Sequence, residues 1–138
     1  MCDNKLELAR YRLDMAGERL DSAKLLLDGG RYKDSIGRSY YAIFTSVRAL
    51  LALEGVDFSK HTGVISHFQK EYIKTGLFEK KYSKYISQAF QIRNNTDYAD
   101  FFIVSKGDAK EQYERAAEFY ETIKNYLIEQ GKMEVTGK

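Results

Sequence analysis

The sequence predicts an all-α protein, an antiparallel up-and-down bundle of four to five helices. Three observations predict this fold class. Apolar residues recur at steps of three and four along most of the 138 residues, which is the period of an amphipathic helix. The chain contains no proline, so long helices can run without interruption. Strand-like patterning is confined to one short run at 101–104. We therefore expect a single helical domain over residues 1–130 and a disordered tail over 131–138.

The first two helices carry the clearest periodicity. The first has a stripe that alternates small and large apolar residues, and it ends at Gly29 and Gly30. At 1.5 Å per residue this helix is roughly 35 Å long. Its stripe consists of Leu6, Ala9, Leu13, Ala16, Leu20, Ala23 and Leu27. The second helix, from about Tyr32 to Glu54, is apolar on two faces, which predicts the central place in the bundle.

Three further helices complete the expected bundle. The third runs from about Thr62 to Lys74, the fourth from about Glu79 to Asn95, and the fifth from Asp108, as its N-cap, to just before Gly131. The inward residues expected on them are Val64, Ile65, Phe68 and Tyr72, then Tyr82, Ile86, Ala89, Phe90 and Arg93, then Ala109, Tyr113, Ala116, Tyr120, Ile123 and Leu127. The run at 101–104 is too short to build a sheet, so we expect it to plug one end of the core.

Composition narrows the class of protein. Hydrophobic residues make up 43% of the chain and charged residues 30%, which is typical of a globular domain rather than a disordered one. A formal net charge of +2 carries no overall signature of nucleic-acid binding. The single cysteine, Cys2, cannot form an internal disulfide and fits a reducing compartment. No apolar run approaches the roughly 20 residues of a membrane span, and residues 1–5 lack a signal-peptide core. We expect a cytoplasmic protein.

A polar cluster at the end of the fourth helix is not what a structural helix needs. It contains Arg93, Asn94, Asn95, Asp97 and Tyr98. Arg93 and Asp97 are four residues apart, so they share a helix face and can form an ion pair. The asparagines and Asp97 favour helix termination, which places the cluster at a helix end. A guanidinium there can bind a phosphate with two hydrogen bonds. Alternatively, the Arg93–Asp97 pair only stabilises the helix end.

The chain has two histidines, His61 and His67. They are six residues apart and do not face the same way, and no cysteine or carboxylate lies at ligand spacing, so we expect no metal. No glycine-rich phosphate loop is present, and we expect no cofactor. His67 precedes Phe68 and is expected to be a buried or half-buried structural residue. Because helix N-termini attract anions, Lys60 and His61 are candidates for phosphate contacts, with a solvated loop as the alternative.

The order of several segments resembles the HEPN domain family, in its small stand-alone prokaryotic form. The matching segments are Ala23 to Leu27 with Gly29 and Gly30, Tyr32 to Ser35, Ser39 to Phe44, Ala49 to Leu51, His61 to Ile65 before Phe68, and Arg93 to Tyr98. The resemblance covers roughly residues 6 to 127. It implies an antiparallel bundle that dimerises. In many members it also implies a metal-independent ribonuclease, often a toxin encoded beside a small nucleotidyltransferase that acts as its antitoxin.

The catalytic signature of that family is an arginine followed, after four to six residues, by a histidine, with the site assembled across the dimer. Arg93 matches the arginine, but Tyr98 stands in place of the histidine, and Asp97 with Tyr98 resembles a variant branch. A tyrosine, with an ordinary pKa near 10, is a poor base for the 2′-hydroxyl of RNA, whereas histidine suits that role. We expect weak or absent ribonuclease activity unless the fold brings His61 to the fourth helix's end.

Some relatives carry a tyrosine two residues after that histidine. In those relatives the partner nucleotidyltransferase attaches a nucleotide to this tyrosine. The matching position here is Asp100, which leaves Tyr98 as the nearest candidate acceptor. We expect a homodimer, because the apolar stripes and the aromatic residues Tyr40, Tyr41 and Phe44 offer more apolar surface than one thin bundle needs.

Together the residues and the resemblance predict a protein that binds nucleotide or RNA phosphate around Arg93. It would form one half of a two-gene, toxin–antitoxin-like system with a nucleotidyltransferase. The candidate catalytic residues are Arg93, Asp97 and Tyr98, and the candidate binding residues are Asn94, Asn95, Lys60 and His61. Two alternatives remain: a non-enzymatic dimerisation or partner-interaction module, and a weak metal-independent ribonuclease.

Overall fold

The computed structural model describes residues 3–98 and 101–129, so the predicted tail at 131–138 lies outside the described residues. Its elements are α1 (Asp3–Asp28), α2 (Tyr32–Glu54), α3 (His61–Phe68), a π-helical turn η1 (Gln69–Ile73), α4 (Lys80–Tyr98) and α5 (Lys106–Glu129). The described residues contain no strand, and the predicted all-α bundle is confirmed. The boundary of the domain at residue 130 stays a prediction. Among the described residues, no helix is long and apolar enough to cross a membrane.

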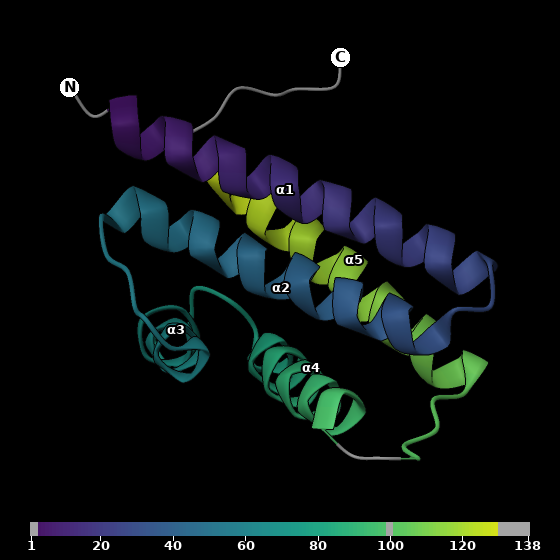
Figure 1. The fold of residues 1–138 in the computed structure, drawn as a ribbon. Helices are drawn as coiled ribbons and strands as arrows, with labels where there is room; N and C mark the ends of the chain where they lie inside the picture. Colours follow the sequence, from purple (N-terminus) through teal and green to yellow (C-terminus); the bar gives the residue numbers. More distant parts are fainter. Residues whose placement is uncertain (1–2, 99–100, 130–138) are drawn as a thin grey trace.

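Three long helices form the body of the bundle, and α3 and α4 pack on one side of it (Figure 1). α1 runs antiparallel to α2, and α5 returns in the direction of α2 (Figure 1). α2 contacts each of the other four α-helices, which confirms its predicted central place. The contacts of α4 with α2 bring the C-terminal end of α4 to the middle of α2, and this arrangement positions the polar cluster described below.

Small residues allow α1 and α2 to approach closely. Ala9, Ala16 and Ala23 of the predicted stripe are fully buried. α2 carries small residues at a similar helical spacing, Ser35, Ser39, Ala42, Ser46 and Ala49, and all five are buried. The Ser35 hydroxyl donates a hydrogen bond of 2.8 Å to the carbonyl oxygen of Ala23, so a buried polar group is satisfied within the interface. The small/large alternation of the sequence therefore encodes this helix pair.

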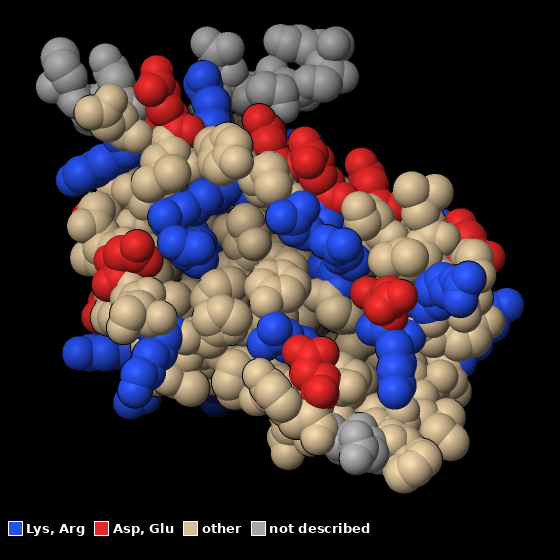
Figure 2. Space-filling model, viewed as in Figure 1, with Lys and Arg blue, Asp and Glu red and all other residues tan. Residues whose placement is uncertain are grey.

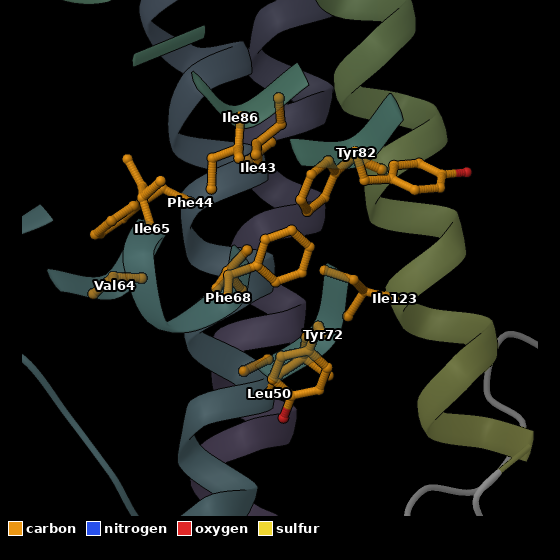
Figure 3. Close-up of a cluster of buried hydrophobic side chains, with 14 of the residues drawn as sticks. Ile43, Phe44, Leu50, Val64, Ile65, Phe68, Tyr72, Tyr82, Ile86 and Ile123 are labelled. Carbon is orange, nitrogen blue, oxygen red and sulfur yellow. The ribbon is translucent and has the colours of Figure 1, made fainter. Parts of the chain in front are cut away.

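An aromatic core joins α3 to the long helices (Figure 3). Phe68 is fully buried, and its ring centroid lies 5.8 Å from that of Tyr72, 5.9 Å from that of Phe78 and 5.5 Å from that of Phe119. Such ring pairs add to the free energy gained by burying their area. Phe119 was not among the expected inward residues of the fifth helix, although it is buried as deeply as Ile123 beside it.

The prediction that residues 101–104 plug the core is wrong. Phe101 is 95% exposed and Ile103 is 85% exposed. Val104 packs against a small core cluster that includes Leu27 and Ala109. Because the chain must turn between α4 and α5 within a few residues, alternate side chains of this run face outward. Apolar composition alone does not reveal that constraint.

The bounds of α4 and α5 also differ from the predicted ones. α5 begins at Lys106, and Asp108 is the third residue of the helix rather than its cap. The Ser105 hydroxyl accepts the Asp108 N–H at 3.0 Å, and the Asp108 carboxylate accepts the Ser105 N–H at 3.4 Å, which is a capping box. α4 continues through Asn94 and Asn95 to Tyr98, so the two asparagines do not end the helix.

Candidate functional site

Side chains from three helices meet where the end of α4 packs against the middle of α2 and the start of α3. We call this group the Arg93 cluster. It consists of Tyr40, Tyr41 and Phe44 from α2, His61 from α3, and Phe90, Arg93 and Asp97 from α4. It is mostly aromatic, with one guanidinium, one imidazole and one carboxylate among the rings. Such a mixture lowers the effective dielectric constant around the charged groups and strengthens their interactions.

Arg93 is fixed on two sides. Its Nε lies 3.1 Å from Oδ2 of Asp97, so the predicted ion pair is present. Its Nη2 donates a hydrogen bond of 2.8 Å to the hydroxyl of Tyr41, and the guanidinium lies 5.1 Å from the Tyr41 ring centroid. The Arg93 side chain remains 20% exposed, and its Nη1 has no hydrogen-bond partner among the described residues. The guanidinium is therefore oriented while some donors stay available to a ligand.

His61 lies in the same cluster, on the other side of the two tyrosines. Its Nδ1 is 2.8 Å from the Tyr40 hydroxyl, and its ring centroid is 4.1 Å from that of Phe44. Burial, followed by the positive charges of Arg93 and Arg48, holds the pKa of His61 below its ordinary value. The imidazole is therefore neutral at neutral pH. In the tautomer with hydrogen on Nδ1, this N–H donates to Tyr40, and Nε2 carries a free lone pair.

Tyr40 and Tyr41 connect Arg93 to His61. The Arg93 guanidinium lies 5.5 Å from the Tyr40 ring centroid, and the His61 ring centroid lies 5.9 Å from it. Burial raises the pKa of the Tyr40 phenol, which keeps it protonated, and in the tautomer described above the phenol oxygen accepts the Nδ1–H of His61. Neither tyrosine was among the expected site residues. The sequence did contain a signal for them. Two adjacent tyrosines on the most buried helix carry hydroxyl groups, and a buried hydroxyl needs a hydrogen-bond partner such as Arg93 or His61.

The other expected site residues lie outside these contacts. Tyr98 is 80% exposed at the end of α4, and Asn95 is exposed on the same helix. Asn94 is half-buried. Lys60 is exposed, with an extended backbone just before α3. None of the four makes a side-chain hydrogen bond among the described residues. The fold thus brings Arg93, Asp97 and His61 together and leaves these four around the cluster.

A cavity of about 380 Å³ opens beside the Arg93 cluster. Tyr41 and Asp97, the two partners of Arg93, form part of its wall. The rest of the wall comes from Leu26 and from Lys33, Asp34, Gly37 and Arg38 at the start of α2. Lysine and arginine side chains are spread over the middle of the face that carries α2, with acidic side chains interspersed and more of them along the upper edge (Figure 2). The cavity could admit a ligand next to the guanidinium.

His67 plays a structural part at the other end of α2. Its side chain is 17% exposed, and Nε2 lies 2.9 Å from a carboxylate oxygen of Glu54. The Tyr72 hydroxyl donates to the other oxygen of Glu54. This half-buried environment agrees with the predicted structural role of His67. Within the described residues, no group of three or more His, Cys, Asp or Glu side chains is placed to hold a metal ion.

Comparison with known proteins gives a consistent set of relatives. A model of the HEPN domain matches residues 9–126. A UPF0332 protein of Thermotoga maritima is 36% identical over 125 residues, which cover 91% of this chain and 95% of the relative. A UPF0332 protein of Pyrococcus horikoshii is 44% identical over 83 residues, 60% of this chain and 58% of the relative. A protein of Methanocaldococcus jannaschii named as a candidate toxin is 31% identical over 124 residues, 90% of this chain and 84% of the relative.

Proposed function

The chain belongs to the HEPN domain family, and from that premise we propose that the Arg93 cluster binds the phosphate of RNA or of a nucleotide. The observation that carries the proposal is the state of Arg93. Asp97 and Tyr41 each occupy one nitrogen of its guanidinium, while Nη1 has no partner among the described residues and the side chain lies beside a cavity. An arginine held in this way loses little conformational entropy when a phosphate binds.

The competing interpretation is that the ion pair with Asp97 is the whole role of Arg93. In that case the pair only stabilises the end of α4. Titration of the protein with an unstructured RNA oligonucleotide and with AMP, followed by fluorescence anisotropy and calorimetry, decides between them. Saturable binding that depends on Arg93 supports the proposal. The absence of binding at low salt, where phosphate contacts are strongest, would contradict it.

We further propose that the protein is one half of a two-gene, toxin–antitoxin-like system whose other member is a small nucleotidyltransferase. A relative named as a candidate toxin supports this proposal. We expect a neighbouring reading frame with a Gly-Ser and Asp-x-Asp nucleotidyltransferase signature. We expect its product to transfer a nucleotide from a nucleoside triphosphate to the Tyr98 hydroxyl, with release of pyrophosphate. Tyr98 is 80% exposed, so this hydroxyl is accessible to an enzyme.

Mass spectrometry after co-expression with that neighbour tests the modification. The expected nucleotide adduct maps to Tyr98 and disappears in Tyr98→Phe. Tyr11→Phe is the matched control, because Tyr11 is also exposed, at 61%, but lies on α1. An unmodified chain, or an adduct that survives Tyr98→Phe, would contradict the assignment of the acceptor.

The protein is expected to be a dimer, although the surface predicted to carry the dimer needs correction. Tyr40 and Phe44 are buried, so they belong to the core. The most exposed large apolar side chains among the described residues are instead Tyr98, Phe101 and Ile103, which are 80%, 95% and 85% exposed. Large apolar side chains gathered at one end of a bundle are typical of an interface. Light scattering should give twice the 16.0 kDa mass of one chain.

A paired substitution tests where the dimer forms. Phe101→Asp combined with Ile103→Asp should give a monomer with unchanged helicity. Leu25→Asp, at a residue 74% exposed on α1, should remain a dimer. A wild-type protein that is monomeric at micromolar concentration would disprove dimerisation. A double variant that stays dimeric would show that the interface does not include Phe101 and Ile103.

The place of His61 favours a second candidate function, metal-independent cleavage of RNA. In that reaction a base removes the proton of a 2′-hydroxyl, the 2′-oxygen attacks the adjacent phosphorus, and the bond to the 5′-oxygen breaks. The products are a 2′,3′-cyclic phosphate and a 5′-hydroxyl, which takes its proton from water. The neutral imidazole of His61 suits the base, and Arg93 suits the stabilisation of the negative charge on the transition state.

A further inference from the structure

The hydroxyl of Tyr41 carries a proton that no described residue accepts. Arg93 Nη2 donates a hydrogen bond of 2.8 Å to the phenol oxygen, so the oxygen is the acceptor there and its own O–H points elsewhere. Among the described residues, no side chain or carbonyl oxygen accepts this O–H. Tyr41 is half-buried and forms part of the wall of the cavity beside the Arg93 cluster. A ligand in the cavity therefore meets a free O–H donor directly beside the guanidinium.

Tyr41 and His61 are suited to different steps of the cleavage reaction. Their ring centroids lie 6.4 Å apart, and the ring planes are at 89° to each other. Tyr41 lines the cavity, whereas His61 does not and packs on Phe44 instead. When a 2′-oxygen attacks phosphorus in line, the attacking and leaving oxygens stand on opposite sides, so two separate groups must handle their protons. The imidazole of His61 serves the attacking oxygen, and the free O–H of Tyr41 is available to the leaving oxygen.

The other proton carriers beside the guanidinium fit this role less well. Tyr40 is 1% exposed, so a ligand cannot reach its phenol. Asp97 is the ionised partner of Arg93 and has no proton to give. A guanidinium does not release its protons. Lys33 also lines the cavity and is exposed, so it is the competing proton donor that the experiment must separate from Tyr41.

We propose that Tyr41 is the general acid of RNA cleavage at this site, and that its phenol gives its proton to the 5′-oxygen as the bond between phosphorus and that oxygen breaks. The inference rests on the cleavage proposed above and replaces water, the proton donor named there, with Tyr41. Nε2 of His61 takes the proton of the 2′-hydroxyl, and the 2′-oxygen bonds to phosphorus. The electron pair of the broken bond stays on the 5′-oxygen, which receives the Tyr41 proton. The imidazolium of His61 and the phenolate of Tyr41 then return to their neutral forms by proton exchange with water.

The contact with Arg93 explains why a phenol can act here. An unprotonated 5′-oxygen is a strongly basic alkoxide and a poor leaving group, so the reaction gains from an acid at this position. The phenol oxygen becomes negative as it gives up its proton, and a guanidinium nitrogen already lies 2.8 Å from it. A positive charge at hydrogen-bond distance stabilises this phenolate. Arg93 thus supports the acid as well as the phosphate.

The test compares two unstructured RNAs that differ in one atom at the cleaved bond. The first has the natural 5′-oxygen, and the second has a 5′-sulfur, which leaves as a thiolate and needs no proton. We expect Tyr41→Phe to slow cleavage of the oxygen RNA by about a hundredfold or more and to slow cleavage of the sulfur RNA far less. A residue that only positions Arg93 would slow both RNAs by the same factor, because Arg93 contacts the phosphate in both. Equal slowing in Tyr41→Phe would therefore overturn the inference and leave the cleavage function intact.

Two further variants and the wild type complete the test. Tyr40→Phe, at the neighbouring tyrosine that contacts His61, acts on the attacking side and should slow both RNAs equally. Lys33→Gln should not discriminate between them either, and a Lys33→Gln variant that is slow only on the oxygen RNA would make Lys33 the acid and overturn the inference. The wild type should cleave both RNAs at similar rates.

The wild-type comparison does not depend on the folding of any variant, which circular dichroism checks separately. A strong preference of the wild type for the sulfur RNA would overturn the inference, because it would mean that no group protonates the oxygen. A wild type that cleaves neither RNA would overturn the cleavage function, and the role of Tyr41 with it.

Discussion

Replacing Arg93 with alanine is expected to weaken RNA binding by roughly ten- to a hundredfold, which corresponds to about 1.5–3 kcal/mol for hydrogen bonds to a charged group. The guanidinium is the charged group of the cluster that is both oriented and still carries free donors. Its loss removes the two-pronged phosphate contact and the positive charge together. Fluorescence anisotropy with a labelled, unstructured RNA measures the change.

Arg115→Ala is the matched control for this prediction. The Arg115 side chain is also 20% exposed, pairs with an acid four residues away at 3.3 Å, and lies 4.9 Å from a tyrosine ring centroid. It lines no part of the cavity beside the cluster. Its removal should cost a similar amount of stability and leave RNA affinity unchanged. Equal losses of affinity in both variants, or an Arg93→Ala variant that does not fold, would support the purely structural interpretation of Arg93.

The second large effect concerns His61. If the protein cleaves RNA, His61→Ala should lower the rate by about 10²- to 10⁴-fold, the usual contribution of general acid–base catalysis. The base must be neutral, and burial lowers the pKa of His61. The rate should therefore rise with pH through a value below the ordinary histidine pKa of about 6.5 and stay level above it. The assay uses unstructured RNA in EDTA, with analysis of cyclic phosphate ends.

Two variants make the assignment of the base specific. His67→Ala removes the other histidine, which pairs with Glu54 away from the cluster, and should leave the rate unchanged. Tyr98→Phe tests the residue that occupies the family's histidine position. Robust cleavage that survives His61→Ala and is lost in Tyr98→Phe would mean that a tyrosine accepts the proton. No cleavage by any form of the protein would restrict the function to binding.

Local periodicity was enough to predict most of the fold. The alternation of Ala16 and Leu20 with their neighbours indicated that a neighbouring helix can approach closely, and in the structure that helix is α2. Periodicity was less informative where the chain turns. It did not predict that Phe101 faces outward or that Ser105, rather than Asp108, caps α5. Those features depend on the path of the chain between two packed helices.

The candidate site was only partly predictable for a related reason. The Arg93–Asp97 pair follows from a spacing of four residues on one helix. The meeting of Arg93 with Tyr41 and His61 joins three helices, and nothing local in the sequence fixes such distances. The sequence could state only that His61 would matter if the fold brought it to the end of α4.

The most direct test of the central claim, that Arg93 binds RNA phosphate, is a nuclear magnetic resonance titration that follows the arginine Nε–H signals. On addition of unstructured RNA, the account predicts a saturable shift of the Arg93 signal, with the Arg115 signal unmoved. The Arg93 shift should reach saturation at the affinity that anisotropy gives and should be lost at high salt. An Arg93 signal that stays in place while RNA binds would contradict the account.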